Sequence, residues 1–375
     1  MQSRRHTAAS RKARRGFTLI ELLVVISIIA TLMSLILPAI QNAREAGRRT
    51  QCLNNIRNVT LAALNFATSN KSRLPALGYF PANPASSGRI NGRSWAVELL
   101  PFLDQQGTYD RWNKDVPFDD TSASANRRLA EDLYVEAFAC PNDESAFVTP
   151  GGLSYVANAG FGDAVIIAND GGAVQHSFLQ EQFDWDGDSI VNDLSASPVV
   201  NDADDTKITK ATGVFWAEFE GLAQTRNASA SIGKIYDGSG NTFMFGENIN
   251  ALGSSTWADP RTRAVGFMFP LDTASVGPGT MIDPTGAIAT NGGGVALPAY
   301  PNEAKTGPDG NAPYLNSNHP GIVVVSMCDG AARTISENLD ERVYLQLMTP
   351  DGTRLRTIPS PNTFLSEEPL SADSF

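Results

Sequence analysis

The stretch Arg14-Arg15-Gly16-Phe17-Thr18-Leu19-Ile20-Glu21 decides the fold of this chain, because it opens an apolar run that continues to Pro38 and Ile40. From Phe17 to Leu37 the only ionisable side chain is Glu21. About 20 apolar residues suffice for an α-helix to cross a bilayer. The run therefore predicts a membrane-spanning helix over residues 17–38.

The segment before this run is basic. It contains no acidic residue and six basic ones: Arg4, Arg5, Arg11, Lys12, Arg14 and Arg15. By the positive-inside rule this places the N-terminus in the cytoplasm and the rest of the chain outside it. A secretory signal peptide is an alternative, but its apolar core is usually 7–15 residues long and ends at an A-x-A-like site, which Leu35-Ile36-Leu37-Pro38-Ala39 matches poorly.

Gly16, Phe17 and a glutamate at the fifth place of the apolar run closely resemble the signal of type IV prepilins and type II secretion pseudopilins. The resemblance implies that a prepilin peptidase cuts after Gly16, removing a leader of residues 1–16, and that Phe17 is then N-methylated. It also implies that the new amine of Phe17 meets Glu21 of a neighbouring subunit in a filament. An ordinary signal-anchor with an isolated glutamate remains the alternative.

The helix is expected to continue beyond the membrane. Pro38 removes one helical hydrogen bond, so we expect a kink or local melting there; many pilins have a proline at this place. Apolar or small residues then recur every three or four positions, which predicts one helical spine over residues 17–70. They are Ile40, Ala43, Ala46, Thr50, Leu53, Ile56, Val59, Ala63 and Phe66. The charges beside this stripe, among them Arg48 and Arg49, are interpreted as a solvated face.

Composition predicts a β-rich head over residues 71–350 and a polar tail over 351–375. Thirty-two Gly and 22 Pro indicate many turns, and short apolar runs bounded by turn residues predict strands at 154–160, 213–216, 241–247 and 265–269. Residues 322–328 and 331–336 predict a hairpin, and 337–347 a helix. The expected fold class is therefore α+β, pilin-like, with a long helix packed on a mainly antiparallel head.

The C-terminal hairpin adds a second resemblance. His319 lies ten residues before Asp329-Gly330, and with residues 95–104, 140–143, 154–160 and 241–247 this pattern resembles a large bacterial family of pilin-like proteins of unknown function. That family carries a C-terminal His-x9-Asp-Gly signature. A general base beside Asp329 is an alternative role for His319, but an imidazole that caps a loop at the base of the hairpin is favoured.

We expect no enzyme and no required cofactor. The mature chain has two histidines, His176 and His319, and no nucleophile elbow, phosphate-binding loop or zinc-binding spacing. The whole chain has a net charge of −11, and loss of the six basic leader residues brings the mature chain to −17. Such a surface does not suit nucleic acid.

Two candidate sites remain. The first is a disulfide. Cys328 ends an apolar strand and is expected to be a buried hydrophobic residue. This leaves Cys52 and Cys140 as a disulfide pair, with three reduced thiols as the alternative.

The second is a calcium loop. An acidic insertion, residues 163–205, holds nine Asp and predicts such a loop, because alternating carboxylates suit Ca²⁺. Its candidate ligands are Asp184, Asp186, Asp188, Asn192 and Asp193; a solvated acidic loop is the alternative.

We therefore expect a structural pilin-like subunit in the bacterial inner membrane, with its head in the periplasm or at the cell surface. Its partners would be a prepilin peptidase, identical or related subunits, an inner-membrane assembly platform and, before assembly, the lipid bilayer. The alternative function is a membrane-anchored module that uses the pilin signal for export and binds a glycan or other ligand through the acidic insertion.

Overall fold

The computed structural model divides into two compact units, Met1–Gly47 and Arg48–Phe375, whose boundary falls inside the first helix. The structure describes residues 18–80, 92–119, 126–163, 207–219, 230–252, 255–271, 290–291, 295–296, 301–302 and 314–352.

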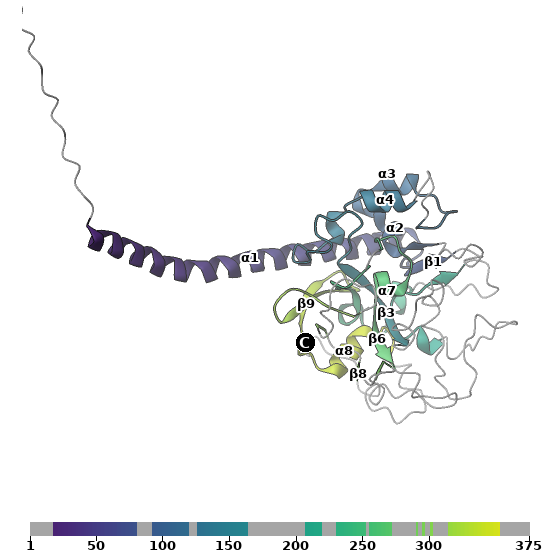
Figure 1. The fold of residues 1–375 in the computed structure, drawn as a ribbon. Coiled ribbons are helices and arrows are strands. Elements are labelled where there is room, and N and C mark those ends of the chain that lie inside the picture. Colours follow the sequence, from purple (N-terminus) through teal and green to yellow (C-terminus); the bar gives the residue numbers. More distant parts are fainter. Residues whose placement is uncertain are drawn as a thin grey trace, which may run out of the picture. The chain divides into compact units, whose positions relative to one another are not determined.

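Helix α1 runs without interruption from Leu19 to Ser69 (Figure 1). Its first part meets the length and composition required to cross a membrane, and that window has no residue buried within the protein. The hydroxyls of Ser27, Thr31 and Ser34 donate to the carbonyls of Val24, Ser27 and Thr31 at 2.8–2.9 Å. These polar groups are therefore satisfied within the helix, as a lipid environment requires.

Pro38 lies inside α1, and the helix continues on both sides of it. Of the two outcomes expected at Pro38, local melting is therefore wrong, and the kink stays a prediction. A proline deletes one hydrogen bond from the ladder, and the bonds of the long helical segments before and after it keep the backbone helical.

The second part of α1 belongs to the head. Its buried residues recur at helical spacing, as the sequence pattern predicts for Ile56, Val59 and Ala63. Thr60 donates to Ser326 Oγ at 2.7 Å, and the amide of Asn55 donates to the carbonyl of Ala139 at 2.8 Å. The helix is thus attached to both the sheet and a loop.

A five-stranded sheet with strand order β10-β9-β5-β3-β6 forms the centre of the head. Its strands are β3 (Tyr155–Asp163), β5 (Phe243–Glu247), β6 (Gly266–Leu271), β9 (Ile322–Met327) and β10 (Ala332–Ser336). The expected C-terminal hairpin is present as β9 and β10. Three pairings are antiparallel, but β3 and β6 run parallel, so the sheet is mixed.

Smaller elements surround this sheet. A second sheet has the order β2-β1-β4, and β7 pairs with β8. The short strands are β1 (Gly78–Phe80), β2 (Arg93–Ser94), β4 (Glu218–Phe219), β7 (Thr290–Asn291) and β8 (Val295–Ala296). The helices are α2 (Trp95–Leu99), η1 (Leu100–Leu103), α3 (Gln106–Arg111), α4 (Asn126–Asp132), η2 (Glu136–Phe138), η5 (Ile232–Lys234), η6 (Ser239–Asn241), α7 (Thr262–Val265) and α8 (Glu341–Met348).

The strand expected at 213–216 is not formed. The backbone amides of Val214 and Phe215 both donate to the carbonyl of Asn158, at 3.2 and 2.8 Å, instead of entering a ladder. Gly213 and Gly160 lie so close that a Cβ on Gly213 would clash with the backbone of Gly160. Gly160 also has φ of +74°. A glycine contact therefore replaces strand pairing here.

Aromatic side chains fill the core between these elements. Trp95 packs against Phe245 with ring centroids 4.8 Å apart and against Phe138 at 5.9 Å. Trp257 packs against Phe138 at 6.1 Å. All four side chains are fully buried, so this cluster joins the sheet to α2 and η2.

Candidate functional site

The amino-terminal site begins at Thr18, because Gly16 and Phe17 lie outside the described residues. Thr18 donates to Glu21 Oε2 from both its backbone nitrogen and its hydroxyl, each at 2.9 Å. In return, the backbone nitrogen of Glu21 donates to the Thr18 hydroxyl at 3.3 Å. The two residues form a capping box, a motif that satisfies free N–H groups at the start of a helix.

This capping box adds a local role for Glu21. Its carboxylate lies at the positive end of the helix dipole, where a negative charge is stabilised. It also lies next to Thr18, the residue that follows Phe17 in the sequence. The Thr-x-x-Glu spacing is visible in the sequence, and its capping role was not part of the sequence prediction.

A second group of residues lies in the head around a disulfide. Cys52 of α1 and Cys140 are joined, with their Cα atoms 4.9 Å apart. This is the pairing favoured from the sequence. Cys328 is free and buried, as expected for a hydrophobic role. Tyr155 donates its hydroxyl to the carbonyl of Cys52 at 3.1 Å, which fixes this turn of α1 against β3.

His319 lies against this disulfide. Its Nε2 is 3.5 Å from Cys140 Sγ, and its Nδ1 is 3.3 Å from Nδ2, the side-chain amide nitrogen of Asn142. The backbone nitrogen of His319 donates to Ser317 Oγ at 3.0 Å. The imidazole is fully buried. His319 therefore holds a loop near the start of β9, as expected. It does so by contacting the Cys140 segment, and the sequence did not predict this contact.

Glu247 completes this group. It is the last residue of β5, lies directly opposite Tyr155 on β3, and is fully buried. Its carbonyl accepts from the backbone nitrogen of Asn316 at 2.9 Å, which brings the segment before His319 to this edge. Ligand atoms of Cys52, Cys140, Glu247 and His319 all lie within 4.8 Å of one another. We refer to these four residues as the disulfide cluster.

The charge of Glu247 has an effect on its neighbours. The pKa of the Tyr155 phenol lies well above its usual value, mainly because the group is buried. The nearby carboxylates of Glu247 and Asp143 raise this pKa further. Tyr155 is therefore neutral at ordinary pH and acts as a hydrogen-bond donor. The sequence signal for Glu247 was an acid at the end of an otherwise apolar strand.

Asp143 organises the loop after Cys140. Its carboxylate accepts from the hydroxyls of Ser145 at 2.6 Å and Ser154 at 2.7 Å, and Ser154 Oγ in turn accepts from the backbone nitrogen of Cys140 at 2.9 Å. Burial raises the pKa of Asp143, while these hydrogen bonds act to lower it. The network connects the segment from Cys140 to Asp143 with Ser154, the residue before β3.

Asp329 and Gly330 lie far from His319. Asp329 Oδ1 accepts from the backbone nitrogen of Ala331 at 2.8 Å, and Gly330 has φ of +94°, so both residues build the turn between β9 and β10. His319 precedes β9 and Asp329 follows it, and a six-residue strand at about 3.3 Å per residue spans about 20 Å. The idea that Asp329 assists His319 as a general base is therefore wrong.

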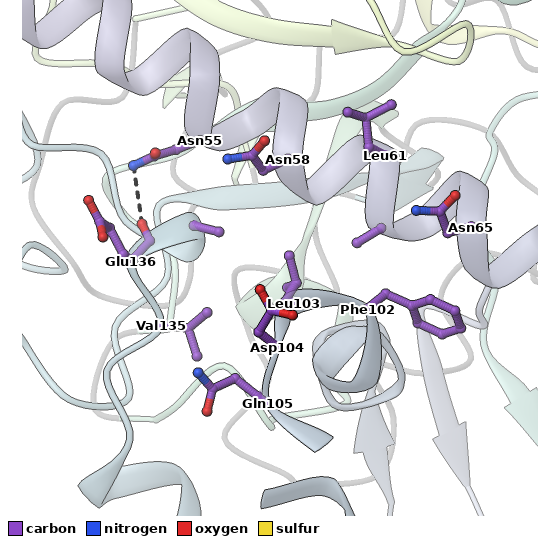
Figure 2. A pocket seen from close by; sticks show the side chains of 12 residues that line it. Asn55, Asn58, Leu61, Asn65, Phe102, Leu103, Asp104, Gln105, Val135 and Glu136 are labelled. Atoms are coloured by element: carbon purple, nitrogen blue, oxygen red, sulfur yellow. Dashed lines mark hydrogen bonds between the residues drawn. The ribbon is translucent and has the colours of Figure 1, made fainter. Parts of the chain in front are cut away.

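A groove of about 630 Å³ opens between the head part of α1 and the segments at η1 and η2. Figure 2 shows Asn55, Asn58 and Asn65 on the α1 side, with Asp104 and Glu136 among the residues opposite. The lining combines amide and carboxylate groups with apolar side chains. It is therefore able to contact a polar ligand.

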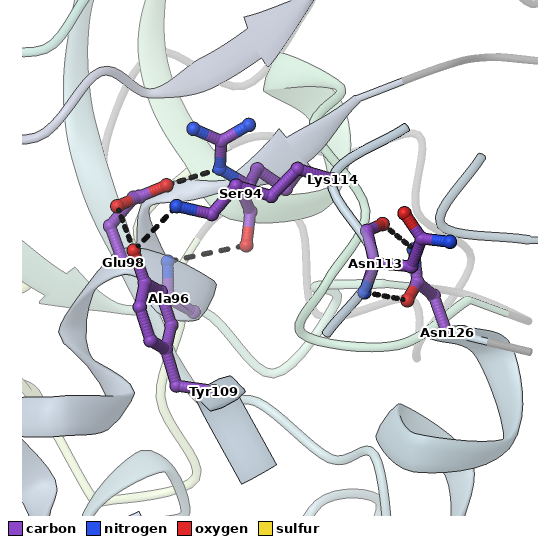
Figure 3. Close-up of polar contacts among 8 residues, drawn as sticks. Ser94, Ala96, Glu98, Tyr109, Asn113, Lys114 and Asn126 are labelled. Atoms are coloured by element: carbon purple, nitrogen blue, oxygen red, sulfur yellow. Dashed lines mark hydrogen bonds and ion pairs between the residues drawn. The ribbon is translucent and has the colours of Figure 1, made fainter. Parts of the chain in front are cut away.

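A second groove, of about 420 Å³, is lined by Tyr79, Arg93 and Glu98 among others. Arg93 pairs with Glu98, and its guanidinium lies 4.2 Å from the centre of the Tyr79 ring. Glu98 also has polar neighbours outside this pair: Lys114 donates to the hydroxyl of Tyr109 at 2.9 Å, and that hydroxyl donates to Glu98 at 3.3 Å (Figure 3). The positive charge of Arg93 is paired with the negative charge of Glu98 inside the groove. This pairing favours a structural role for these side chains.

Two arginines of α1 make contacts that the sequence did not predict. Arg48 donates to Asn142 Oδ1 at 3.3 Å and Arg49 to Thr334 Oγ1 at 2.7 Å. Both arginines are exposed, as expected for a solvated face, and these bonds add a connection from that face to the Cys140 loop and to β10.

The candidate calcium site cannot be placed in the fold. Asp184, Asp186, Asp188, Asn192 and Asp193 lie outside the described residues, as does almost all of the acidic insertion.

Comparison with known protein families gives two matches. Residues 41–342 match the family described as "Protein of unknown function (DUF1559)", and residues 11–37 match the prokaryotic N-terminal methylation motif. Comparisons with curated proteins and with solved structures give no significant match. The methylation motif implies export and prepilin-like processing, the latter by a prepilin peptidase. Together with α1 it indicates a membrane-anchored protein with an extracytoplasmic head.

Proposed function

The chain belongs to the DUF1559 family, and from this premise we propose that it is a structural pilin-like subunit of a type IV pilus-like or type II secretion-like filament. A prepilin peptidase removes residues 1–16, and the mature chain begins at methylated Phe17. The observation that carries this proposal is the start of α1, where the residues matched by the methylation motif include an exposed apolar helix with one acid, Glu21, at its first turn.

The exposed apolar surface requires a partner in both states of the protein. Side chains such as Leu19, at 84% exposed, and Leu35, at 70% exposed, would be unfavourable in water. Before assembly we place them in the inner membrane, with the N-terminus in the cytoplasm and the head outside. After assembly, the same side chains contact the helices of identical or related subunits.

Glu21 determines how assembly starts. An acid in a membrane helix is unfavourable, and pairing with a cation offsets that cost. Cleavage after Gly16 creates that cation as the amine of Phe17, and a neighbouring subunit brings it to Glu21. Each subunit thus supplies one amine and one carboxylate, and the contact is heterologous. Repetition of a heterologous contact that does not close produces a helical fibre.

This function involves an inner-membrane assembly platform and no nucleic acid, since the mature chain carries a strong negative charge. It also involves no catalysis by this chain. The histidine of the disulfide cluster is buried, and a substrate would need an open path to it.

Mass spectrometry of the native N-terminus tests the processing step. We expect a chain that begins at Phe17 with one added methyl group, and retention of the leader in Gly16→Leu because the peptidase then meets a bulky residue at the cut. Gly47→Ala is the matched control, since a Cβ at Gly47 meets nothing within 4 Å. A native chain that begins at Met1, or one cut after Ala39, would contradict the proposal.

Filaments sheared from cells test assembly. Glu21→Gln keeps an oxygen that accepts from Thr18 but removes the charge, whereas Thr18→Ala removes the side-chain part of the capping box and keeps the charge. We expect both variants to insert in the membrane and only Glu21→Gln to lose most of its filament yield. Equal yields from Glu21→Gln and the unmodified chain would defeat the assembly role.

A second function is favoured by one observation, the groove lined by Asn55, Asn58 and Asp104. In that case the chain is a membrane-anchored module whose head binds a glycan or another polar ligand, with the acidic insertion at 163–205 as a further contact. Single membrane-bound copies that bind such a ligand, with loss of binding in Asn58→Ala, would favour this function over the filament.

A further inference from the structure

We propose that the disulfide cluster is a zinc site whenever the bond between Cys52 and Cys140 is reduced. The cluster offers two sulfurs, one imidazole nitrogen and one carboxylate, and its ligand atoms lie within 4.8 Å of one another. Four ligands of these types in tetrahedral arrangement are what Zn²⁺ prefers in closed sites. The site lies in the head alone and does not depend on filament assembly.

The geometry already fits zinc at one pair of ligands. Zinc–sulfur and zinc–nitrogen distances of about 2.3 and 2.0–2.1 Å give a tetrahedral separation of about 3.5 Å between the two ligand atoms. Cys140 Sγ and His319 Nε2 are 3.5 Å apart. Two thiolates on one zinc lie about 3.8 Å apart by the same reasoning, so the sulfurs of Cys52 and Cys140 must separate when their bond is broken.

Burial also suits a zinc site at this place. All four residues are fully buried, and structural zinc sites are closed, with four protein ligands and no position open to water. One Zn²⁺ with two thiolates, a neutral imidazole and the Glu247 carboxylate has a net charge of −1. The same ion would join α1, the Cys140 loop, β5 and the segment before β9.

Reduction of the disulfide supplies the two sulfur ligands. A dithiol reductant gives two electrons and two protons, so its own two S–H groups become a disulfide while the bond between Cys52 and Cys140 breaks into two thiols. Zinc then binds both sulfurs and releases their two protons to solvent. Oxidation of the two thiolates by a disulfide reverses the change and releases the ion.

Asn142 is the positioning residue of this site. Its amide nitrogen faces His319 Nδ1 at 3.3 Å, so in this orientation Nδ1 accepts and the ring proton is on Nε2, beside Cys140. Zinc requires Nε2 without that proton, so the proton moves to Nδ1 and the Asn142 amide turns its oxygen toward the ring, which breaks the hydrogen bond that this oxygen accepts from Arg48. Such partners orient metal-bound imidazoles, and their loss weakens binding by about 10–100-fold.

Metal titration of the full-length chain in detergent tests the proposal. The metal-free protein is compared in its oxidised form and after reduction with a water-soluble phosphine, with Zn²⁺ measured by equilibrium dialysis and Co²⁺ by its absorption spectrum. We expect one ion per reduced chain, with thiolate-to-cobalt charge-transfer bands of a tetrahedral site, and no such bands in the oxidised chain. Absence of the bands in reduced protein, or identical spectra in both forms, would overturn the proposal.

Variants assign the ligands. We expect Glu247→Gln and His319→Gln each to weaken zinc binding by at least about tenfold, and Cys52→Ser with Cys140→Ser to abolish the thiolate bands. Cys328→Ser is the matched control, because this buried thiol is outside the cluster, and it should bind like the unmodified chain. The bands should also survive Asp186→Ala with Asp188→Ala. Unchanged affinity in both Glu247→Gln and His319→Gln would disprove the four-ligand site.

If reduction of the disulfide unfolds the head, a refolding measurement tests the zinc site instead. Tryptophan fluorescence reports the head because all five tryptophans follow residue 94. If the reduced chain is unfolded without metal, we expect stoichiometric Zn²⁺ to restore the native fluorescence. A reduced chain that stays unfolded in the presence of zinc would overturn the proposal.

Discussion

The two parts of helix α1 use apolar side chains in opposite ways. Between Leu19 and Ile40 the large apolar residues are exposed, whereas between Cys52 and Ala67 the helix buries Ile56 and Val59 completely. Both parts are regular helix. The difference therefore arises from what each part is able to contact: the head supplies a packed surface for the second part, and a bilayer or neighbouring subunits are needed for the first.

Polar groups differ in the same way. In the first part, hydroxyls bond to the carbonyls of their own helix, as Ser27 does to Val24. In the second part, Asn55 bonds to the Cys140 loop and Thr60 to Ser326 as well as to its own helix. A helix that must fit lipid keeps its polar contacts internal, whereas a helix that belongs to a folded head uses them to fix its position.

The largest expected effect on the head comes from removing the disulfide. Cys52 and Cys140 are 88 positions apart in the sequence, and the chain-entropy model assigns such a loop about 4–5 kcal/mol of stability. We expect Cys52→Ala with Cys140→Ala, in zinc-free buffer, to lose a large part of that amount in urea unfolding followed by tryptophan fluorescence. Thiol counting under denaturing conditions provides the control: three free thiols in the native protein would exclude the disulfide.

A matched pair of substitutions tests the contrast within α1 directly. Ile56→Ala should lower the unfolding free energy of the head by about 2–5 kcal/mol, because it leaves a cavity in a packed core. Ile36→Ala makes the same chemical change in the exposed part, where Ile36 is 47% exposed, and should leave head unfolding unchanged. Equal losses from the two variants would show that the two parts fold as one unit.

Calcium should act on the head alone. If the acidic insertion binds Ca²⁺ with Kd of about 10⁻⁴ M, then about 1 mM Ca²⁺ adds about 1.4 kcal/mol to the stability of the folded state. Asp186→Ala with Asp188→Ala should abolish this gain. An unchanged melting temperature on adding calcium to metal-stripped protein, with no heat of binding by calorimetry, would leave a solvated acidic loop as the explanation.

The smallest expected effect concerns pH and Asp143. Burial raises the pKa of this carboxyl in the folded head, so the folded state holds its proton more tightly than the unfolded state does. Stability from this group is therefore present below the unfolded pKa, about 3.9, and is lost as pH rises through the folded pKa. Asp143→Asn should make urea unfolding less dependent on pH above about 4, whereas the exposed control Asp132→Asn should leave the dependence unchanged.

Much of the fold was predictable because it is encoded in local periodicity. The helix at 19–69, the hairpin of β9 and β10, and the strands β3, β5 and β6 all follow from apolar spacing and turn residues. The strand expected at 213–216 was wrong because the close contact between Gly213 and Gly160 depends on two segments far apart in the chain. The same is true of the parallel pairing of β3 with β6.

By itself, the sequence determined the processing signal, the membrane-length apolar helix and the pattern of its buried stripe, because each depends on residues close together in the chain. Only the tertiary structure decided that Glu247 and His319 gather around the disulfide of Cys52 and Cys140, and that Asp329 and His319 lie at opposite ends of β9, a strand about 20 Å long. The physical reason is that strand pairing and helix packing, which set these distances, act between residues that lie up to hundreds of positions apart.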